Sequence, residues 1–397
     1  MKTICFDLRA LQIGHQNRGI GMYIISVLEH LPKNEDKYLF YCFDKNNPVK
    51  DLGVKMSASY EIVQTKTRNT ILGSPKDLLT IYKLVHHAFK PLRAYKPDTF
   101  VQFDFTLGVP HWNGVHTIVI GYDLIPLIMN NDYIPSASFA WKHSTNKLRS
   151  VIRAWYYKAK YYLYYNVYKR ADMIACISEA TAKSFQELLH ISRNRLTVIP
   201  LAPVTTESLP NYDLANKFSK PYIFYIGGTD ARKHIEDIIR AYNIVRGRGH
   251  DISLLLAGYE LKSLGEMTDV IGKSAIQKSP YRQDIHFLGF ITDAEKMGLY
   301  NKALAFVFTS FYEGFGLPVV EAMAASCPVI TYNNSSIPEA AGSAALLVET
   351  GNYSAIATQI TLLLSDPKLR SQLIGRGRNQ ATIFSWDSYI TTLLGLL

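Results

Sequence analysis

The sequence predicts an α/β protein of two domains, each built on a parallel β-sheet with helices on both faces. Short apolar runs alternate with amphipathic helical patterns along the chain, which is typical of βαβ units. The 397 residues, 48% of them hydrophobic, suffice for two cores. The alternation lapses at residues 200–221, where prolines cluster with polar residues. We therefore predict a first domain at residues 1–217 and a second at residues 218–380.

Five apolar runs are expected as strands of the first domain. A helix is expected at residues 20–31, where apolar residues recur with the helical period. Residues 153–170 mix tyrosines with basic residues in a helix-compatible stretch. This composition suits a membrane interface or an acceptor groove, and equally a helix that packs its rings on its own domain. The expected strands are residues 3–6, 38–43, 99–103, 116–120 and 173–177.

Six further apolar runs are expected as strands of the second domain. Helices are expected between them, including one at residues 235–245 and one at residues 317–325. The expected strands are residues 222–226, 252–257, 285–288, 305–309, 329–332 and 345–348.

Basic residues are concentrated in the first half of the chain. Residues 1–200 hold 26 Lys and Arg against 15 Asp and Glu, whereas the remainder holds 17 against 18. This asymmetry indicates an anionic partner, and the candidates are a membrane surface, a phosphorylated acceptor and nucleic acid. Because no nucleic-acid recognition motif accompanies the charge, we expect no nucleic-acid partner.

The four cysteines are scattered, without a C-x-x-C pair or a histidine at metal-ligand spacing. This predicts core thiols, no metal site and a reducing compartment. Asp7 and Arg9 interrupt the opening segment, where a signal peptide would be apolar. We expect no membrane span either, and hence a cytoplasmic protein.

A glycine turn follows the expected strand at residues 222–226. Gly227 and Gly228 end that strand, and Arg232 and Lys233 precede the next helix. Glycines let backbone amides approach phosphate oxygens, and the two cations would neutralise a diphosphate. The alternative is an ordinary tight turn between strand and helix, which also uses glycine.

Two glutamates flank a Gly-Phe-Gly turn in the second domain. Glu313 follows the strand at residues 305–309, at the edge where open α/β sheets bind ligands, and Glu321 lies in the next helix. Two carboxylates there could accept hydrogen bonds from the hydroxyls of a sugar and a ribose. The alternative is two ordinary charges near a helix start.

The segments FYEGFGLPVVEAMAASCPVI and SSIPEAAGSAALLVE resemble the donor-site signature of glycosyltransferase family 4. The resemblance covers most of the chain, because ACISEATAKSFQELL, RLTVIPLAP, YIGGTDARKHIEDIIRAY, LLLAGYE and IHFLGF follow the order of that family. RGIGMYIISVLEHL and GYDLIPL resemble motifs of the acceptor-binding domain of that family. The resemblance implies the GT-B fold, with two Rossmann-like domains whose parallel sheets face each other across a cleft.

The resemblance also implies roles for individual residues of the donor site. Arg232 and Lys233 would bind the donor diphosphate, Glu313 the hydroxyls of the transferred sugar, and Glu321 the ribose. The loop after Gly289 would take the base. The residues 381–397 would form a helix that crosses back to the first domain. Backbone groups that would line the donor belong to Gly19, Gly21, Gly227, Gly228, Gly314, Phe315, Gly316 and Leu317.

The central motif departs from the family pattern at one position. Tyr122 stands where the family commonly has a histidine placed against the donor sugar or the acceptor. A tyrosine can donate a hydrogen bond but does not titrate near neutral pH, so its contact with acceptor or sugar is left open. Asp123 is a candidate for positioning the acceptor hydroxyl, with an Asx-type turn as the alternative.

The reaction implied is a retaining hexosyl transfer without a carboxylate nucleophile. Catalysis would consist mainly of stabilising the departing diphosphate. No D-x-D motif is present, so we expect a metal-independent enzyme with no cofactor besides the nucleotide-sugar co-substrate. The absence of a G-x-G-x-x-G turn with a following acidic residue excludes a dinucleotide-dependent dehydrogenase.

The pairing of RGIGMY with DLIPL resembles bacterial enzymes that transfer mannose from GDP-mannose in O-antigen or exopolysaccharide synthesis. The basic first domain fits a lipid-diphosphate-linked glycan acceptor at the inner face of an anionic membrane. Donors left open are UDP-glucose, UDP-galactose and dTDP-rhamnose. A non-catalytic protein of the same fold that binds sugar nucleotides or glycans is the other alternative.

Overall fold

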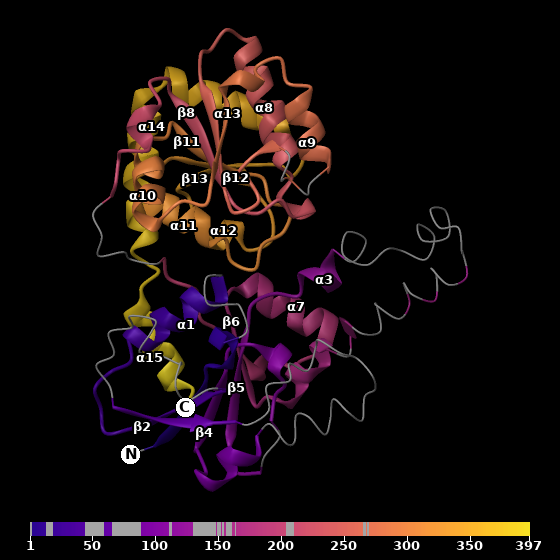
Figure 1. Ribbon diagram of the computed structural model, residues 1–397, viewed down its shortest axis with the longest axis vertical. Helices are drawn as coiled ribbons and strands as arrows, with labels where there is room; N and C mark the ends of the chain where they lie inside the picture. Colours follow the sequence, from indigo (N-terminus) through magenta and orange to yellow (C-terminus); the bar gives the residue numbers. More distant parts are fainter. Residues whose placement is uncertain are drawn as a thin grey trace. The chain divides into compact units, whose positions relative to one another are not determined.

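The chain divides into two compact units (Figure 1). Unit 1 comprises Met1–Pro200 and Trp386–Leu397, and unit 2 comprises Leu201–Ser385. Each unit has its own parallel sheet and its own buried core. The computed structural model describes residues 2–12, 19–43, 59–65, 89–110, 113–129, 164–203, 210–264 and 270–397, and the positions 148, 152, 155, 161, 162 and 267.

Unit 1 is built on a sheet in the order β3-β2-β1-β4-β5-β6-β7, in which the described strands pair in parallel. The five expected strands are present. β3 and β7 were not predicted because both lie at sheet edges, where β3 buries few residues and β7 is short. The strands are β1 (Thr3–Asp7), β2 (Lys37–Cys42), β3 (Tyr60–Gln64), β4 (Thr99–Gln102), β5 (His116–Gly121), β6 (Met173–Cys176) and β7 (Leu196–Val198).

Among the residues that the structure describes, the helices of unit 1 are mostly short. The helix expected at residues 20–31 is α1 (Gly19–Glu29), and α7 (Glu179–Leu189) is capped by the Ser178 side chain, which accepts from the Thr181 amide. The other elements are η1 (Arg9–Gln12), η3 (Lys90–Ala94), η4 (Phe105–Leu107), α3 (Ile125–Ile128), η5 (Asn166–Arg170), η6 (Arg193–Arg195) and α15 (Trp386–Gly395).

The end of the tyrosine-rich stretch packs on its own unit. Tyr165 and Tyr168 are buried, and their rings lie 5.1 Å and 4.8 Å from the ring of Phe105. Trp155 and Tyr162, further back along the stretch, are exposed. The packing reading therefore holds for the end of the stretch, and most of residues 153–163 lie outside the described part of the chain.

Unit 2 is built on a parallel sheet in the order β10-β9-β8-β11-β12-β13. All six strands coincide with expected runs: β8 (Tyr222–Ile226), β9 (Ser253–Ala257), β10 (Ile285–Gly289), β11 (Ala305–Phe308), β12 (Val329–Tyr332) and β13 (Ala345–Val348). The helical elements are η7 (Ala215–Lys217), η8 (Ala231–Lys233), α8 (Ile235–Gly247), α9 (Val270–Gln277), η10 (Arg282–Asp284), α10 (Asp293–Lys302), α11 (Leu317–Ala324), α12 (Ile337–Ala341), α13 (Tyr353–Ser365) and α14 (Pro367–Ala381).

The end of the linker packs on unit 2, so the two units divide after Pro200, 17 residues before the predicted position. The amide of Asn211 donates to the carbonyl of Ala294 in α10 at 2.9 Å. Gly298 of α10 lets the two backbones approach, because a Cβ there would lie 2.0 Å from the Asn211 carbonyl oxygen. The polar composition of residues 200–221 predicted a linker, and the contact between Asn211 and α10 shows that the end of this segment belongs to unit 2.

Helix α15 belongs to unit 1, although the chain reaches it from unit 2. Helix α15 lies beside α1 (Figure 1), and the rings of Trp386 and Tyr389 lie 5.8 Å and 5.5 Å from the ring of Tyr23. His30, at the end of α1, stacks on Trp386. Among the described residues, no helix has the length and apolar character needed to cross a membrane.

Candidate active site

Each sheet has one position where the chain order reverses direction. In unit 2 the chain runs outward from β8 to β9 and β10, then returns to place β11 on the other side of β8. In open parallel sheets the loops at such a switch point separate and leave room for a ligand at the carboxyl ends of the strands. Residues after β8 and β11 are therefore the first to consider for a site.

Arg232 and Lys233 follow β8 in the short helix η8. Asp230 caps this helix by accepting from the Arg232 amide. The Thr309 hydroxyl, at the end of β11, donates to the Lys233 carbonyl at 2.8 Å, and the Phe311 amide donates to the Arg232 carbonyl at 2.8 Å. The backbone of the two cations is thus attached to the neighbouring strand.

Both cations point to one carboxylate. The Glu313 Oε1 atom lies 2.6 Å from Arg232 Nη1 and 2.6 Å from Lys233 Nζ. Burial alone would raise the pKa of Glu313, but the charges of Lys233 and Arg232 outweigh it and hold that pKa below its usual range. Burial lowers the pKa of Lys233, against the attraction of Glu313. Asp230 Oδ1 also lies 3.7 Å from Arg232 Nε, so the two cations are balanced by two carboxylates.

Two serines after β12 hold the Glu313 backbone. The Glu313 amide donates to Ser335 Oγ at 3.0 Å, and Ser336 Oγ donates to the Glu313 carbonyl at 3.0 Å. Arg232 Nη1 also donates to the Tyr312 carbonyl at 2.9 Å. The sequence singled out neither serine, although both lie in the SSIPEAA segment that carried the resemblance.

The Gly-Phe-Gly turn leads directly into helix α11. Gly316 has φ +99°, and a Cβ there would lie 2.7 Å from Ile337 Cδ1, so glycine is required. The Phe315 ring is buried against Phe384. Leu317 opens the helix, Pro318 has no amide hydrogen, and the Val319 amide donates to the Gly316 carbonyl at 2.9 Å. The donor contacts expected of Gly314, Phe315, Gly316 and Leu317 therefore stay predictions.

Glu321, on α11, pairs with a cation that the sequence did not indicate. Lys296 of α10 places Nζ 3.0 Å from Glu321 Oε1 and 2.9 Å from Asp293 Oδ1. Burial opposes the charge on Lys296, yet the two carboxylates outweigh it and raise its pKa. No local pattern joins positions 296 and 321, so only the packing of α10 on α11 reveals the pair.

The glycine turn after β8 is largely occupied by internal bonds. The Gly227 amide donates to the Ala257 carbonyl at 3.0 Å, and the Thr229 amide donates to Glu260 Oε2 at 2.9 Å. A Cβ on Gly258 would lie 2.0 Å from the Gly227 carbonyl oxygen, so the turn also needs a close approach. These bonds favour the tight-turn reading of Gly227 and Gly228, whose contact with a diphosphate stays a prediction.

The remaining predicted residues lie in unit 1. Gly19 and Gly21 form the first turn of α1 rather than a separate turn. The Asp123 Oδ1 atom accepts from the Ile125 amide at 3.0 Å, which is the Asx-type bond considered above. The structure thus joins Arg232 and Lys233 to Glu313 in unit 2, where Glu321 pairs with Lys296, and it places Gly19, Gly21 and Asp123 in unit 1.

Tyr122 follows β5 and packs its ring against Tyr23 at 5.6 Å. Burial raises its pKa well above the ordinary value, so the hydroxyl stays protonated at neutral pH. Its buried oxygen has no hydrogen-bond partner among the described residues. The hydroxyl is thus closed off from solvent in this structure, and it offers no general base.

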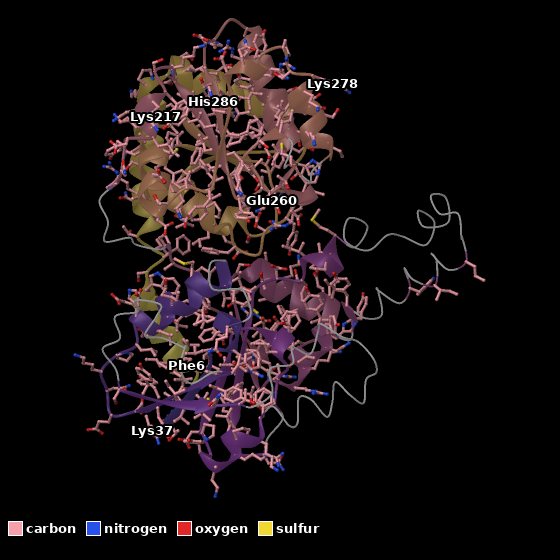
Figure 2. The ribbon with its side chains drawn as sticks, viewed as in Figure 1. Phe6, Lys37, Lys217, Glu260, Lys278 and His286 are labelled. Carbon is pink, nitrogen blue, oxygen red and sulfur yellow. The ribbon has the colours of Figure 1, made fainter. Side chains whose placement is uncertain are left out.

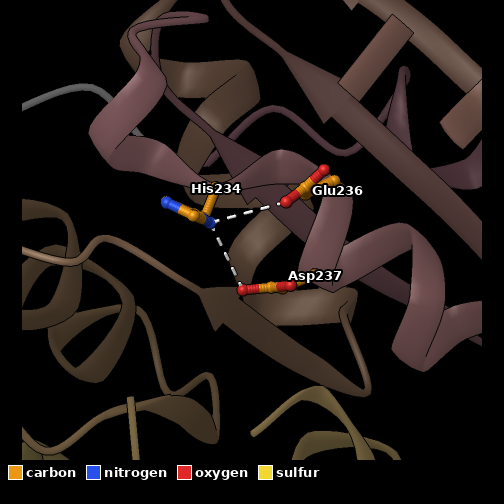
Figure 3. Close-up of side chains that lie close together, drawn as sticks. All are labelled: His234, Glu236 and Asp237. Carbon is orange, nitrogen blue, oxygen red and sulfur yellow. Dashed lines mark ion pairs between the residues drawn. The ribbon is translucent and has the colours of Figure 1, made fainter. Parts of the chain in front are cut away.

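A cluster of three potential metal ligands lies at the start of α8 (Figure 3). His234 Nδ1 lies 3.7 Å from Glu236 Oε1 and 3.6 Å from Asp237 Oδ2. The Asp237 carboxylate also accepts from the Tyr332 hydroxyl at 2.7 Å, and Arg240 lies 3.7 Å from Glu236 Oε2. These protein partners make the cluster an ion-pair network that fixes the start of α8.

Two family models match the chain. The model described as Glycosyl transferases group 1 matches residues 213–380, and the model described as Glycosyltransferase Family 4 matches residues 17–202. Sucrose-phosphate synthase from Thermosynechococcus elongatus superposes with a TM-score of 0.70 at 17% identity, over 100% of this chain and 98% of that chain.

Two curated relatives are mannosyltransferases of Escherichia coli. O-antigen chain mannosyltransferase B is 31% identical over 231 residues, which are 56% of this chain and 59% of that protein. Serotype-specific mannosyltransferase WbdA is 27% identical over 291 residues, which are 71% of this chain and 33% of that protein. The match therefore spans less than two thirds of the length of either relative.

The two parallel sheets, each with a switch point, and the superposition on sucrose-phosphate synthase define the GT-B fold, as the sequence predicted. The chain belongs to glycosyltransferase family 4, and residues 213–380 form its group 1 domain.

Proposed function

We propose that this chain is a retaining glycosyltransferase that moves a hexose from a nucleotide sugar to a glycan acceptor. The observation that carries the proposal is the Glu313 carboxylate held at 2.6 Å by both Arg232 and Lys233, at the switch point of unit 2. A donor diphosphate matches the two cations, and sugar hydroxyls match the carboxylate.

In this proposal Arg232 and Lys233 stabilise the departing nucleoside diphosphate. The bond between the sugar C1 atom and the phosphate oxygen breaks, and the acceptor oxygen bonds to C1 on the same face. A phosphate oxygen of the leaving group takes the acceptor proton. Glu313 orients the sugar through its hydroxyls and forms no bond to C1. Preorganised charges of this kind commonly contribute about 10²–10³ in rate for one donor group.

The preferred donor is GDP-mannose, because the two curated relatives are named as mannosyltransferases. Their names also favour a role in bacterial surface polysaccharide synthesis. UDP-glucose, UDP-galactose and dTDP-rhamnose are the competing donors. Tyr122, in place of the family histidine, is the observation that favours the second candidate, a non-catalytic protein that binds sugar nucleotides or glycans.

The proposed acceptor is a lipid-diphosphate-linked glycan at the inner face of the cytoplasmic membrane. The excess of basic residues in residues 1–200 supports this acceptor, since each Lys or Arg near an anionic surface contributes about 1 kcal/mol. Leu148, Ile152 and Trp155 are exposed apolar residues of the same half, which suits a peripheral contact with lipid.

A thermal-shift panel tests the donor. Purified protein is mixed with GDP-mannose, UDP-glucose, UDP-galactose, UDP-GlcNAc, dTDP-rhamnose and NAD, where a ligand at 100 times its Kd stabilises by roughly 2.7 kcal/mol. A shift with GDP-mannose alone is expected. Stabilisation by another nucleotide sugar alone would replace the donor, and no shift with any would favour a non-catalytic protein.

Removal of divalent metal ions tests the proposed metal independence. We expect EDTA to leave the transfer rate unchanged, because Arg232 and Lys233 supply the positive charge that a metal ion would otherwise bring to the diphosphate. The rate is measured with and without EDTA, and after adding Mg²⁺ or Mn²⁺ back. A rate that collapses with EDTA and returns with the metal ion would contradict the mechanism.

A further inference from the structure

Glu260 lies just beyond the end of β9, in a loop interlocked with the end of β10. The Gly258 amide donates to the Gly289 carbonyl at 2.8 Å, and the Gly289 amide donates to the Leu261 carbonyl at 2.9 Å. Figure 2 shows Glu260 closer than His286, a residue within β10, to the lower end of unit 2. The loop is therefore held at the carboxyl ends of the strands, where Arg232 and Lys233 also lie.

The Glu260 carboxylate is fixed through one of its two oxygens. Oε2 accepts from the Thr229 amide at 2.9 Å and from the Thr229 hydroxyl. The side chain is otherwise exposed. The carboxylate is thus oriented by the turn after β8, while it remains accessible to a ligand through the rest of its surface.

Two exposed aromatic rings belong to these two interlocked loops, because Tyr259 directly precedes Glu260 and Phe290 directly follows Gly289. Tyr259 is 73% exposed and Phe290 is 71% exposed, one at the end of β9 and the other at the end of β10. Lys262 Nζ lies 4.6 Å from the centre of the Tyr259 ring. Large rings left in water beside a polar group are suited to stacking on a flat ligand.

The positions of the other donor contacts leave this end of the sheet for the base. Glu313 and its serines occupy the side of β11 and β12, and the two cations lie between β8 and β11. β9 and β10 lie on the opposite side of β8. A nucleoside diphosphate bound by the cations, with its sugar at Glu313, extends its base toward β9 and β10.

We propose that Glu260 selects guanine as the base of the donor, an inference that rests on the proposed function. Guanine presents two adjacent N–H donors, N1–H and N2–H, on one edge, and an ionised carboxylate accepts hydrogen bonds only. Uracil and thymine present one N–H between two carbonyl oxygens, which a carboxylate repels. Glu260 therefore favours guanosine diphosphate and disfavours uridine and thymidine diphosphates.

Calorimetric titration of the full chain with GDP, IDP and UDP tests this role, because IDP lacks only the 2-amino group of guanine. In the wild type we expect GDP to bind more tightly than IDP and UDP, and in Glu260→Gln the preference for GDP should fall roughly 5- to 150-fold. Glu349→Gln, at the opposite edge of the same sheet after β13, should keep the wild-type ratios.

Two other outcomes would overturn the inference. If Glu260 only braces the turn at Thr229, Glu260→Gln lowers the affinity for all three nucleotides equally and leaves the ratio of GDP to IDP unchanged. If the wild type binds UDP more tightly than GDP, both the proposed GDP-mannose donor and this role of Glu260 are contradicted. Wild-type preference for GDP with an unchanged ratio in the variant removes the role of Glu260 alone.

Discussion

The two units place opposite charges at equivalent positions of their sheets, with different results. In unit 1 the switch point lies between β1 and β4, and Asp7 at the end of β1 pairs with Arg9 at 2.5 Å. In unit 2 it lies between β8 and β11, and Glu313 pairs with Arg232 and Lys233. The first pair is closed off from solvent, with Arg9 2% and Asp7 0% exposed.

Aromatic residues explain why the pair of unit 1 is closed. The Arg9 guanidinium lies 4.8 Å from the ring centres of both Tyr41 and Phe89, and Gln102 Nε2 donates to Asp7 Oδ2 at 2.7 Å. In unit 2 the side chains of Arg232 and Lys233 keep 17% and 11% exposure. The same topology therefore holds a structural ion pair in one unit and charges that a ligand can reach in the other.

The largest expected effect comes from breaking the closed pair. Asp7→Ala leaves Arg9 buried without its carboxylate, which should lower the free energy of unfolding by about 3–5 kcal/mol. Glu313→Ala should lower it by only about 1–3 kcal/mol, because its cations are partly exposed. Urea unfolding measures both. Equal losses in the free energy of unfolding would contradict the difference between a closed ion pair in unit 1 and an accessible one in unit 2.

The next effect concerns transfer rather than stability. Lys233→Ala and Glu313→Ala should each lower the transfer rate by about 10²–10³ or more, because the diphosphate loses a cation or the sugar loses its clamp. Circular dichroism and gel filtration should show folded protein. Lys278→Ala, an exposed lysine of the same unit, serves as the control (Figure 2). Normal turnover by both variants would remove the site assignment.

A smaller effect is expected at the pair that the sequence missed. Lys296→Met leaves Glu321 without its cation, so the KM for the donor should rise about tenfold with a lesser change in kcat. Lys302→Met, at the exposed end of the same helix, should behave like the wild type. Initial rates at varied donor concentration separate the two constants. An unchanged KM would contradict a ribose contact at Glu321.

The smallest effect is a dependence of stability on pH. Because the pKa of Glu313 is held below its unfolded value, its ionised form adds stability above about pH 4.3, and this is lost as the pH falls through the folded pKa. The wild type and Glu313→Gln should therefore differ by a constant amount from about pH 6 to about pH 8 and converge in acid. Urea unfolding at each pH measures the difference in the free energy of unfolding between the two proteins. A difference that grows as the pH falls would contradict this prediction.

Within the site, some residues could be predicted from local sequence patterns and others could not. The sequence predicted β8 and β11, which end at Ile226 and Phe308, and the motif that carries Glu313 and Glu321, because apolar period and turn residues are local patterns. It did not predict Lys296, Ser335 or Ser336. Their partners lie 25, 22 and 23 residues away along the chain.

The sequence by itself therefore determined the two parallel sheets, the family and the charged residues after β8 and β11. Only the tertiary structure decided which charges are open to a ligand. Asp7 and Arg9 are two charges that interrupt the apolar opening segment of the sequence, and in the structure they are buried, with Tyr41 and Phe89 beside the Arg9 guanidinium. Burial depends on residues that packing brings from distant segments, so a local pattern of charges carries no information about it.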